Sequence, residues 1–466
     1  MNSHPDQPSS DLSTPAGQSQ PLTLRTKPNR HFPFLSRHPW VLATAIADRG
    51  KKGGERRADA SSKPSAGERE FVAAAGPADP PAETPELGDA VELLDHDGNW
   101  IARGLYNPAS RLRLRLYSFS RNEAIDDAMF ARRIDEAIGR RRLTTPSNLR
   151  ETGERLIFSE SDRISGLIVD RYADCLSVQF TAAALLSRGP LLIEQVLQAA
   201  SKHGTPCQRV ISRIDAATAR HEGVTSGRVA EVESWSRGIS LDQAVVPGSQ
   251  ESDTVWYQHN ELKMAIDLRD GQKTGGYLDQ QANHAEAARY MEGRRVLDIC
   301  TYTGGFALAA ARAGASEVIG VDSSEKALEM AQRNATENSL TQVSFQRADC
   351  FDDLKARRAE NESFDAVILD PPRFAGARRQ VDAALRAYAR LNMSAIDLLP
   401  PGGILVTCSC SGHVSRADFL NMLVDAGRKR QRDIIILQSR GPSPDHPCAV
   451  SCPESDYLKC VIAQVQ

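Results

Sequence analysis

Several features that would assign this 466-residue chain to a class of protein are missing from it. No apolar run approaches the ~20 residues that a membrane-spanning helix needs, so we expect no transmembrane segment. Residues 1–20 are polar and rich in Pro and Ser, without the apolar core of a signal peptide. We therefore expect a disordered tail at 1–20 and a cytoplasmic protein.

The cysteines are not spaced as in a disulfide-bonded framework. There are nine of them, an odd number without compact spacing, which is not typical of a disulfide-stabilised domain. Cys448 and Cys452 lack the second pair of ligands that a zinc site would require. We expect free thiols in a reducing compartment and no bound metal.

Neither acidic nor basic residues are in large excess, because the formal net charge is only −3. Its distribution is uneven, since ten arginines between Arg103 and Arg142 stand against five acidic residues. Such a cluster is typical either of a phosphate-binding patch or of a solvated arginine-rich surface. The sequence leaves both interpretations open.

The first two domains are predicted from periodicity and composition. A chain of this length should contain two or three domains. Period-two alternation in Ala90–Leu94 and Leu112–Tyr117 predicts strands of a small, mostly β domain over 21–119. A Gly, Ala, Pro and charge-rich insertion at 49–86 interrupts this domain and cannot build a core. Residues 120–250, with helical patterns at 126–142 and 191–200, a strand hairpin at 166–180 and a strand at 209–212, are expected to form an α+β domain.

The C-terminal part, residues 251–466, alternates between strand and helix patterns. Alternation of this kind predicts right-handed βαβ units and a mainly parallel sheet. We therefore predict a Rossmann-like α/β domain here. The expected strands begin with 295–299 and continue with 318–322, 343–346, 366–370, 404–408 and 433–437.

Acidic residues mark the carboxyl ends of these strands. Asp298 precedes the turn Tyr302-Thr303-Gly304-Gly305, where glycines allow backbone amides to approach a ligand. Asp322 ends the second strand, where a carboxylate can hold the two ribose hydroxyls of an adenosine. Asp349 and Asp370 follow the next two strands. The turn lacks a full GxGxxG motif, which disfavours a dinucleotide and favours S-adenosylmethionine.

Two thiols, Cys408 and Cys410, close the apolar strand that begins at Gly403. Residues two apart in a strand face the same side, so periodicity does not choose between them. Cys408 ends the apolar run and is typical of core filler, whereas Cys410 stands beyond it on the rim where α/β proteins bind ligands. Cys410 is therefore less typical of core filler than Cys408, and Asp370 is expected on the same rim.

Further motifs extend over nearly the whole chain outside 1–20 and 49–86. They are Arg37-His38-Pro39-Trp40-Val41, Gly166-Leu167-Ile168-Val169-Asp170-Arg171-Tyr172, Thr274-Gly275-Gly276-Tyr277-Leu278-Asp279-Gln280-Gln281, Tyr302-Thr303-Gly304-Gly305-Phe306, Asp370-Pro371-Pro372-Arg373-Phe374, Ser409-Cys410-Ser411, Asp445-His446-Pro447 and Tyr457-Leu458-Lys459. With these motifs the chain resembles the bacterial 23S rRNA (cytosine-5)-methyltransferases. That family combines an N-terminal PUA domain with a class I methyltransferase domain.

The resemblance implies S-adenosylmethionine as cofactor, RNA of the large ribosomal subunit (23S rRNA) as partner, and 5-methylcytosine as product. It also implies a covalent intermediate on Cys410, assisted by Asp370. The residues expected to bind the cofactor are Tyr277, Asp279, Gln280, Asp298, Tyr302, Thr303, Gly304, Gly305, Asp322, Asp349 and Asp370. A monomer and a homodimer are both compatible with the sequence.

Some features leave alternatives open. Gln281 stands where the family usually has an arginine, and Cys408 stands where it often has an aromatic residue. The turn Asp370-Pro371-Pro372 also resembles an acidic Pro-Pro turn of amino-group methyltransferases, which need no thiol. His446 is an alternative proton acceptor, and a non-catalytic RNA-binding assembly factor is a third hypothesis. The other cysteines of the C-terminal domain are interpreted as structural: Cys300, Cys350, Cys448, Cys452 and Cys460.

Overall fold

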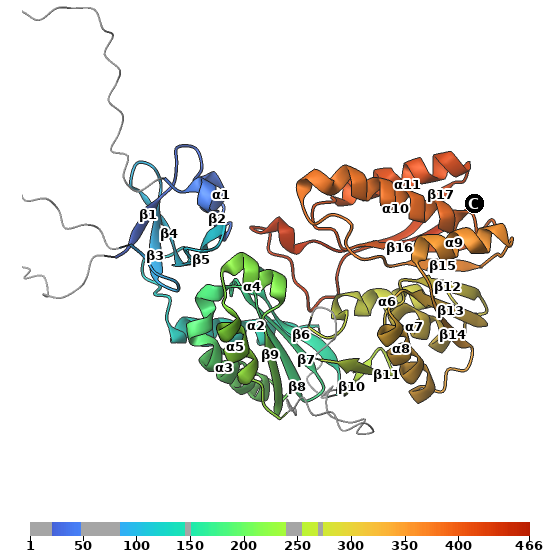
Figure 1. The fold of residues 1–466 in the computed structure, drawn as a ribbon, viewed down its shortest axis with the longest axis horizontal. Coiled ribbons are helices and arrows are strands. Elements are labelled where there is room, and N and C mark those ends of the chain that lie inside the picture. Colours follow the sequence, from blue (N-terminus) through green and yellow to red (C-terminus); the bar gives the residue numbers. More distant parts are fainter. Residues whose placement is uncertain (1–20, 48–83, 145–150, 239–253, 269–273) are drawn as a thin grey trace, which may run out of the picture.

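The computed structural model describes residues 21–47, 84–144, 151–238, 254–268 and 274–466. The predicted tail and almost all of the insertion at 49–86 lie outside these ranges. The described residues form three bodies, and the C-terminal segment reaches back from the third body toward the first (Figure 1). Within the described ranges, no helix combines the length and the apolar character needed to cross a bilayer.

The first body is a five-stranded sheet in the order β1-β3-β4-β5-β2. The predicted alternation is confirmed, since Val91, Leu93 and Leu114 point into its core. Its elements are β1 (Thr23–Arg25), α1 (Phe32–Leu35), β2 (Trp40–Leu42), η1 (Ala43–Ala45), β3 (Ala90–Leu94), β4 (Trp100–Tyr106) and β5 (Leu112–Ser118).

The second body is a four-stranded sheet in the order β6-β7-β8-β9, with helices packed on it. The predicted hairpin is confirmed as β7 and β8, which pair antiparallel. The elements are α2 (Asp127–Arg141), β6 (Gly153–Phe158), η2 (Ser159–Asp162), β7 (Leu167–Tyr172), β8 (Cys175–Phe180), η3 (Ala183–Arg188), α3 (Gly189–Lys202), β9 (Arg209–Arg213), α4 (Ala216–Glu222) and α5 (Ser226–Ser234).

A separate antiparallel hairpin joins the second and third bodies. It consists of β10 (Thr254–His259) and β11 (Leu262–Asp267). β10 contacts β6 and β7, whereas β11 contacts helices of the third body. The sequence patterns did not predict this hairpin as a separate sheet.

The third body is a seven-stranded sheet in the order β14-β13-β12-β15-β16-β18-β17. The predicted Rossmann-like α/β fold is confirmed. Only β18 runs against its neighbours, and this terminal strand was not among those expected. The strands are β12 (Arg295–Ile299), β13 (Glu317–Asp322), β14 (Val343–Arg347), β15 (Ala366–Leu369), β16 (Gly403–Ser409), β17 (Ile434–Arg440) and β18 (Lys459–Val465).

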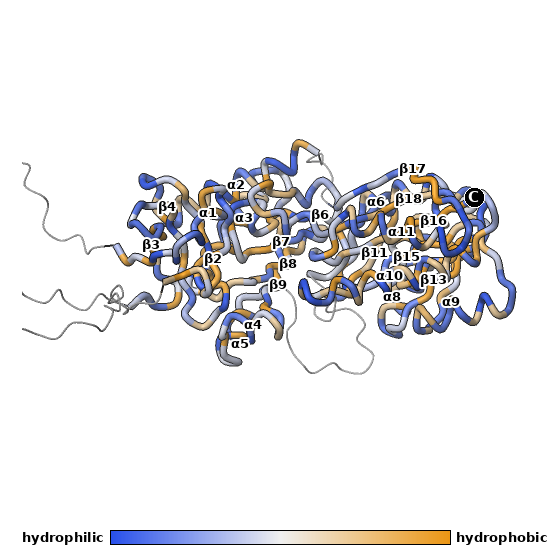
Figure 2. Tube along the Cα trace, turned by 90° about the horizontal axis from the view of Figure 1, so that it is seen from above, coloured by the Kyte–Doolittle hydropathy of each residue, from blue (hydrophilic) through white to orange (hydrophobic). Residues whose placement is uncertain are grey.

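Helices cover both faces of this sheet and bury two apolar layers against it. The tube coloured by hydropathy shows orange, hydrophobic stretches along this body (Figure 2). One face carries α6 (Gln281–Ala288), α7 (Gly305–Arg312) and α8 (Glu325–Glu337). The other carries α9 (Cys350–Ala359), α10 (Val381–Ile396) and α11 (Arg416–Arg430). The short 3₁₀ turns are η4 (Leu278–Gln280), η5 (Arg378–Gln380) and η6 (Pro453–Ser455).

Most of the arginines between Arg103 and Arg142 are paired with acidic residues of the protein. Seven of the ten form ion pairs within the protein: Arg103, Arg115, Arg132, Arg133, Arg140, Arg141 and Arg142. Arg115 of β5 lies 3.3 Å from both Glu160 and Glu222, and therefore connects the first body to the second. Periodicity alone does not show such pairing, because most of the acidic partners lie on other elements; Arg111 and Arg121 of the cluster are exposed.

Replacing Arg115 with methionine should destabilise the protein by about 3–5 kcal/mol, because it leaves Glu222 buried and without its cation. Chemical denaturation monitored by circular dichroism measures this loss. Arg111→Met is the matched control, since Arg111 is exposed on the same segment and should change stability by less than ~0.5 kcal/mol. Equal stability of the two variants would contradict a connecting role for Arg115.

Candidate active site

A cavity of 620 Å³ lies at the carboxyl ends of the parallel strands of the third body. This position follows from the fold, because the ends of parallel strands meet at one edge of the sheet. The cavity collects ten of the twelve residues predicted for the site: Tyr277, Asp279, Gln280, Tyr302, Thr303, Gly305, Asp322, Asp349, Asp370 and Cys410.

The other two predicted residues, Asp298 and Gly304, do not line the cavity. Asp298 is buried, and its Oδ2 accepts hydrogen bonds from Thr301 Oγ1 at 2.6 Å and from the Ala307 amide at 3.0 Å. Burial raises the pKa of Asp298 to about 7. Gly304 has φ +90°, a left-handed conformation that starts α7. Both residues shape the turn that the cofactor was expected to contact.

Backbone amides hold the two acidic strand ends in place. Asp322 accepts hydrogen bonds from the amides of Tyr302 and Ser324, both at 2.9 Å. Asp349 caps α9 by accepting from the Phe351 amide at 2.9 Å. A carboxylate at the end of β13 suits vicinal ribose hydroxyls, and the nearby Phe351 ring offers an apolar wall for adenine. The residues of this half of the cavity therefore fit an adenosine.

Cys300 and Cys350 also line this half of the cavity, although the sequence interpretation made them structural. A hydrogen bond with Cys350 and burial together raise the pKa of the Cys300 thiol. Their structural role stays a prediction, although both lie on the cavity wall. No local pattern marks them, because Cys300 follows β12 and Cys350 begins α9, and only the strand order places them side by side.

The two thiols of the β16 segment, Cys408 and Cys410, differ in burial. Cys408 is fully buried opposite Cys460 of β18, and burial together with Cys460 raises the pKa of its thiol. Cys410 follows the end of β16 and lines the cavity, with Sγ 4.0 Å from the carbonyl oxygen of Pro371. The expected difference in depth between Cys408 and Cys410 is confirmed.

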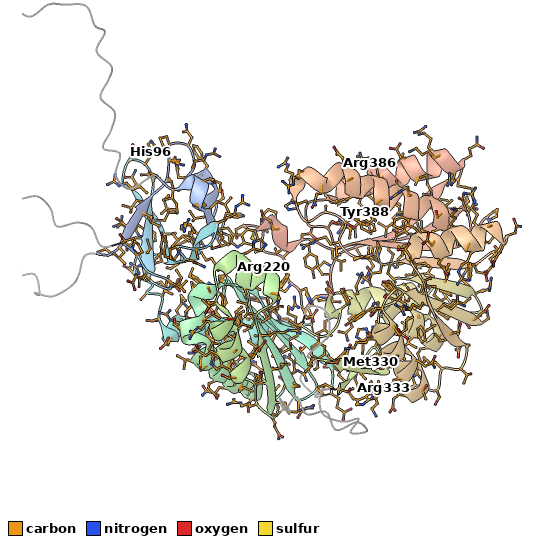
Figure 3. The ribbon with its side chains drawn as sticks, in the orientation of Figure 1. His96, Arg220, Met330, Arg333, Arg386 and Tyr388 are labelled. Atoms are coloured by element: carbon orange, nitrogen blue, oxygen red, sulfur yellow. The ribbon has the colours of Figure 1, made fainter. Side chains whose placement is uncertain are left out.

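Ser411 fixes the turn that carries Cys410. Its Oγ lies 3.0 Å from the hydroxyl of Tyr388, which comes from α10 (Figure 3), and accepts a hydrogen bond from the Ala375 amide at 3.2 Å. Ala375 follows the turn that begins at Asp370. The two loops that carry the predicted catalytic residues are therefore tied together.

Lys459 of β18 lies beside this turn and was not predicted. The residue is 2 % exposed, and its Nζ donates to the carbonyl oxygens of Ser411 and Tyr457, both at 2.7 Å. Burial lowers the pKa of Lys459 to about 8, and the negative charge of a Cys410 thiolate acts in the opposite direction. A cation is thus held next to the thiol by an antiparallel strand far along the chain.

Polar side chains surround the thiol on the cavity wall. Gln280 Nε2 donates to Asp370 Oδ1 at 3.0 Å, and the Tyr457 hydroxyl donates to Asp279 Oδ2 at 2.5 Å. Burial raises the pKa of Tyr277, and the charges of Asp370 and Cys410 add to this effect. These contacts hold the carboxylates of two separate segments, Asp279 and Asp370, around one end of the cavity.

His446 does not line the cavity. Its Nδ1 lies 2.8 Å from Asp445 Oδ1, and its ring packs against Phe158 of β6. The hypothesis that His446 accepts a proton during catalysis is therefore not supported by its position.

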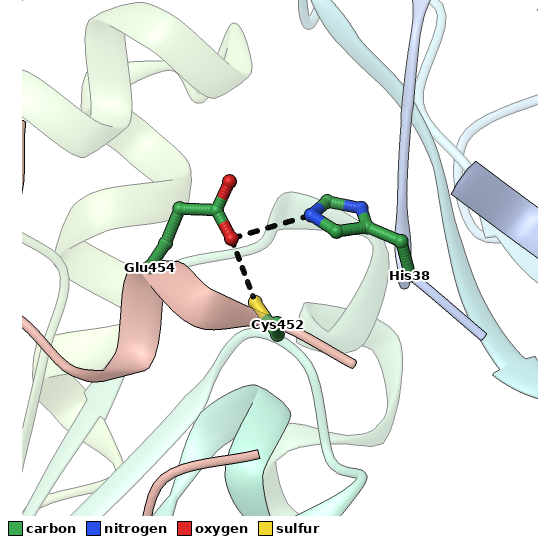
Figure 4. Close-up of side chains that lie close together, drawn as sticks. All are labelled: His38, Cys452 and Glu454. Carbon is green, nitrogen blue, oxygen red and sulfur yellow. Dashed lines mark hydrogen bonds and ion pairs between the residues drawn. The ribbon is translucent and has the colours of Figure 1, made fainter. Parts of the chain in front are cut away.

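A second polar cluster lies between the first body and η6 (Figure 4). The possible metal-ligand atoms of His38, Cys452 and Glu454 lie within 4.8 Å of one another. The Trp40 amide donates to His38 Nδ1, which places the ring proton on Nε2, the atom 3.3 Å from Glu454 Oε2. Cys452 Sγ donates to the same carboxylate oxygen at 3.5 Å. Hydrogen bonds account for this cluster, which links the C-terminal segment to the first body.

Two family models match the chain. Residues 208–440 match an S-adenosylmethionine-dependent methyltransferase family, and residues 75–119 match a PUA-like domain. Curated relatives named ribosomal RNA large subunit methyltransferase I cover 95 % of the chain and 99 % of their own length. The protein of Shewanella denitrificans is 34 % identical over 448 residues, and that of Tolumonas auensis is 35 % identical over 445 residues.

Solved structures share the same fold. A candidate SAM-dependent methyltransferase from Streptococcus mutans has a TM-score of 0.70 and 16 % identity, and the match covers 95 % of this chain and 100 % of that one. A second chain with the same TM-score, identity and coverage was solved in complex with S-adenosylhomocysteine. At this identity the likeness shows the fold alone.

Iodoacetamide should modify Cys410 in the folded protein and leave Cys408 unmodified, because only Cys410 lines the cavity. Tandem mass spectrometry of the tryptic peptide that contains both thiols measures the two rates. Cys408→Ala and Cys410→Ala proteins serve as assignment controls. Modification of Cys408 as fast as Cys410 would contradict the difference in depth.

Proposed function

The chain belongs to the S-adenosylmethionine-dependent methyltransferase family whose members are named ribosomal RNA large subunit methyltransferase I, and from this membership we propose that it forms 5-methylcytosine in large-subunit ribosomal RNA. Cys410 is the proposed nucleophile. The observation that carries the proposal is the placement of the Cys410 thiol in one cavity with Asp370 and with the residues that fit an adenosine.

The chemistry requires a nucleophile because C5 of cytosine is too weakly nucleophilic to take a methyl group directly. Bond formation between the Cys410 sulfur and C6 pushes an electron pair onto C5, which then bonds to the methyl carbon. S-Adenosylmethionine, when bound, would supply that methyl group as an electrophile, and the sulfur of the S-adenosylhomocysteine product would keep the electron pair of the broken C–S bond. Transfer of the C5 proton to solvent and expulsion of the Cys410 thiolate restore the aromatic ring.

The surrounding residues suit this sequence of steps. A thiolate attacks, so the Lys459 cation near Cys410 favours the reactive form. Asp370 follows the strand adjacent to the one that precedes Cys410. Its carboxylate can accept a hydrogen bond from the N4 amine of the base, and in its protonated form it can donate to N3, where negative charge develops when the sulfur adds to C6. Gln280 holds the Asp370 carboxylate in position.

The substrate is proposed to be RNA with a base that can leave its helix or loop. The PUA-like match at 75–119 and the names of the relatives support this substrate class. A target base enters a cavity of this kind only after it is unstacked, which is easiest in single-stranded or looped RNA. The C-terminal segment contacts the first body through Glu454 and His38, and Tyr457 of the same segment lines the cavity.

An amino-group methyltransferase is the second candidate. Asp370, Pro371, Pro372 and Phe374 all line the cavity, and an acidic Pro-Pro turn can hold an exocyclic amine without help from a thiol. The two candidates differ in the product nucleoside and in their need for Cys410. A non-catalytic RNA-binding factor would form no product at all.

Cys410→Ala should lower 5-methylcytosine formation on the order of 10³-fold or more, because the nucleophile is removed. Cys408→Ala is the matched control and should retain near-normal turnover, since it removes a buried thiol two residues away. Transfer of labelled methyl groups to ribosomal RNA, followed by nucleoside mass spectrometry, measures both rates and identifies the product.

Cofactor binding by Cys410→Ala shows that the variant is folded. Normal 5-methylcytosine formation by Cys410→Ala would refute the covalent mechanism. Methylated adenine or guanine as product would support the amino-group candidate, and the absence of any transfer by the unmodified protein would support the binding factor.

A further inference from the structure

A pair of buried imidazoles lines the cavity and has no part in the proposed chemistry. His259 ends β10 and His284 lies on α6, and they are 2 % and 5 % exposed. His259 Nε2 and His284 Nδ1 are 2.8 Å apart, which is a hydrogen-bond distance. Both residues belong to the lining of the cavity that also contains Asp322 and Cys410.

The His284 ring lies against the beginning of α7. A Cβ atom on Gly305 would lie only 2.4 Å from His284 Cε1, so glycine is required for this contact. The first amides of a helix have no acceptor within the helix. Asp298 accepts from the Ala307 amide, but within the described part of the chain the amides of Gly305 and Phe306 have no acceptor. Hydrogen-bond donors therefore gather beside His284.

The hydrogen bonding of the pair determines its tautomers. Burial lowers the pKa of both imidazoles, that of His259 to about 4, so the pair is neutral near pH 7. His259 Nδ1 is buried and has no partner among the described residues. A buried N–H without an acceptor is rarer than a buried lone pair without a donor, which leaves Nδ1 unprotonated. His259 Nε2 then donates to His284 Nδ1, and His284 carries its own proton on Nε2.

We propose that His284 Nε2–H and the amides of Gly305 and Phe306 bind the carboxylate of the amino-acid end of S-adenosylmethionine, with His259 as a positioning residue that fixes the tautomer of His284. The inference rests on the cofactor part of the proposed function. Uncharged donors and a helix N-terminus can hold a carboxylate without burying a cation.

The charges along the cavity support this orientation of the cofactor. Asp322 and Asp349 lie at the adenosine half, where they would repel a carboxylate but suit hydroxyl and amino groups. Asp279 is the acidic group whose charge acts on His284, and it can attract the ammonium group of the same amino-acid end. The carboxylate of the amino-acid end therefore meets N–H donors, and its ammonium group meets the Asp279 carboxylate.

Two ligands distinguish binding at this carboxylate subsite from binding in the rest of the cavity. 5′-Methylthioadenosine contains the adenosine and the sulfur of the cofactor but lacks the amino-acid carboxylate. Isothermal titration calorimetry of the full-length protein with S-adenosylhomocysteine and with 5′-methylthioadenosine measures the two affinities without RNA. His284→Leu should weaken S-adenosylhomocysteine about tenfold and leave 5′-methylthioadenosine within about twofold.

Conservative variants test the roles of the two rings. His284→Gln keeps an N–H donor and should recover part of the lost affinity. His259→Gln keeps a donor toward His284 Nδ1 and should bind almost normally, whereas His259→Leu should weaken only S-adenosylhomocysteine. Binding of 5′-methylthioadenosine shows that each variant is folded.

Equal weakening of both ligands in His284→Leu would make the pair a packing element and overturn the inference. Unchanged binding of S-adenosylhomocysteine would also overturn it. Failure of Cys410→Ala to lose 5-methylcytosine formation would refute the covalent mechanism but leave this result intact, so the two proposals fail separately.

Discussion

The parallel pairing of β15 with β16 is the constraint on which the site depends. In its register Leu369 lies opposite Thr407, so the residues that follow each strand leave the sheet at the same edge. Asp370 and Cys410 meet there, and Ser411 ties the two loops together through the Ala375 amide. A shift of register by one residue would turn Cys410 away from the cavity, because side chains alternate between faces.

Because β18 is antiparallel, its first residue lies at the edge of the sheet where the parallel strands end. This strand enters beside β16 from the opposite direction, so its first residue, Lys459, reaches the carboxyl end of β16. The same segment brings Tyr457 to Asp279 and Glu454 to His38. One short stretch of chain thus connects the thiol, the cavity wall and the first body, while buried ion pairs of Arg115 join the first and second bodies.

The sequence predicted the features that local patterns encode. Strand–helix alternation predicted the Rossmann-like fold. Acidic residues at strand ends predicted Asp322, Asp349 and Asp370 as residues of the cavity. The end of the apolar run predicted that Cys408 is more deeply buried than Cys410. Contacts between distant segments were not predictable in this way. Lys459 and the pair of His259 and His284 have no local signal, and most of the acidic partners of the arginines of 103–142 lie on other elements.

The central claim is that the Cys410 sulfur bonds to a cytosine during methyl transfer. Ribosomal RNA that contains 5-fluorocytosine tests it directly, since the C5 fluorine is not lost as a proton and the thioether persists. Incubation with S-adenosylmethionine should give a protein–RNA adduct that survives denaturation, and mass spectrometry of the digested adduct should locate the nucleotide on Cys410. An adduct on Cys408, or methyl transfer to the fluorinated RNA with no adduct, would contradict the account.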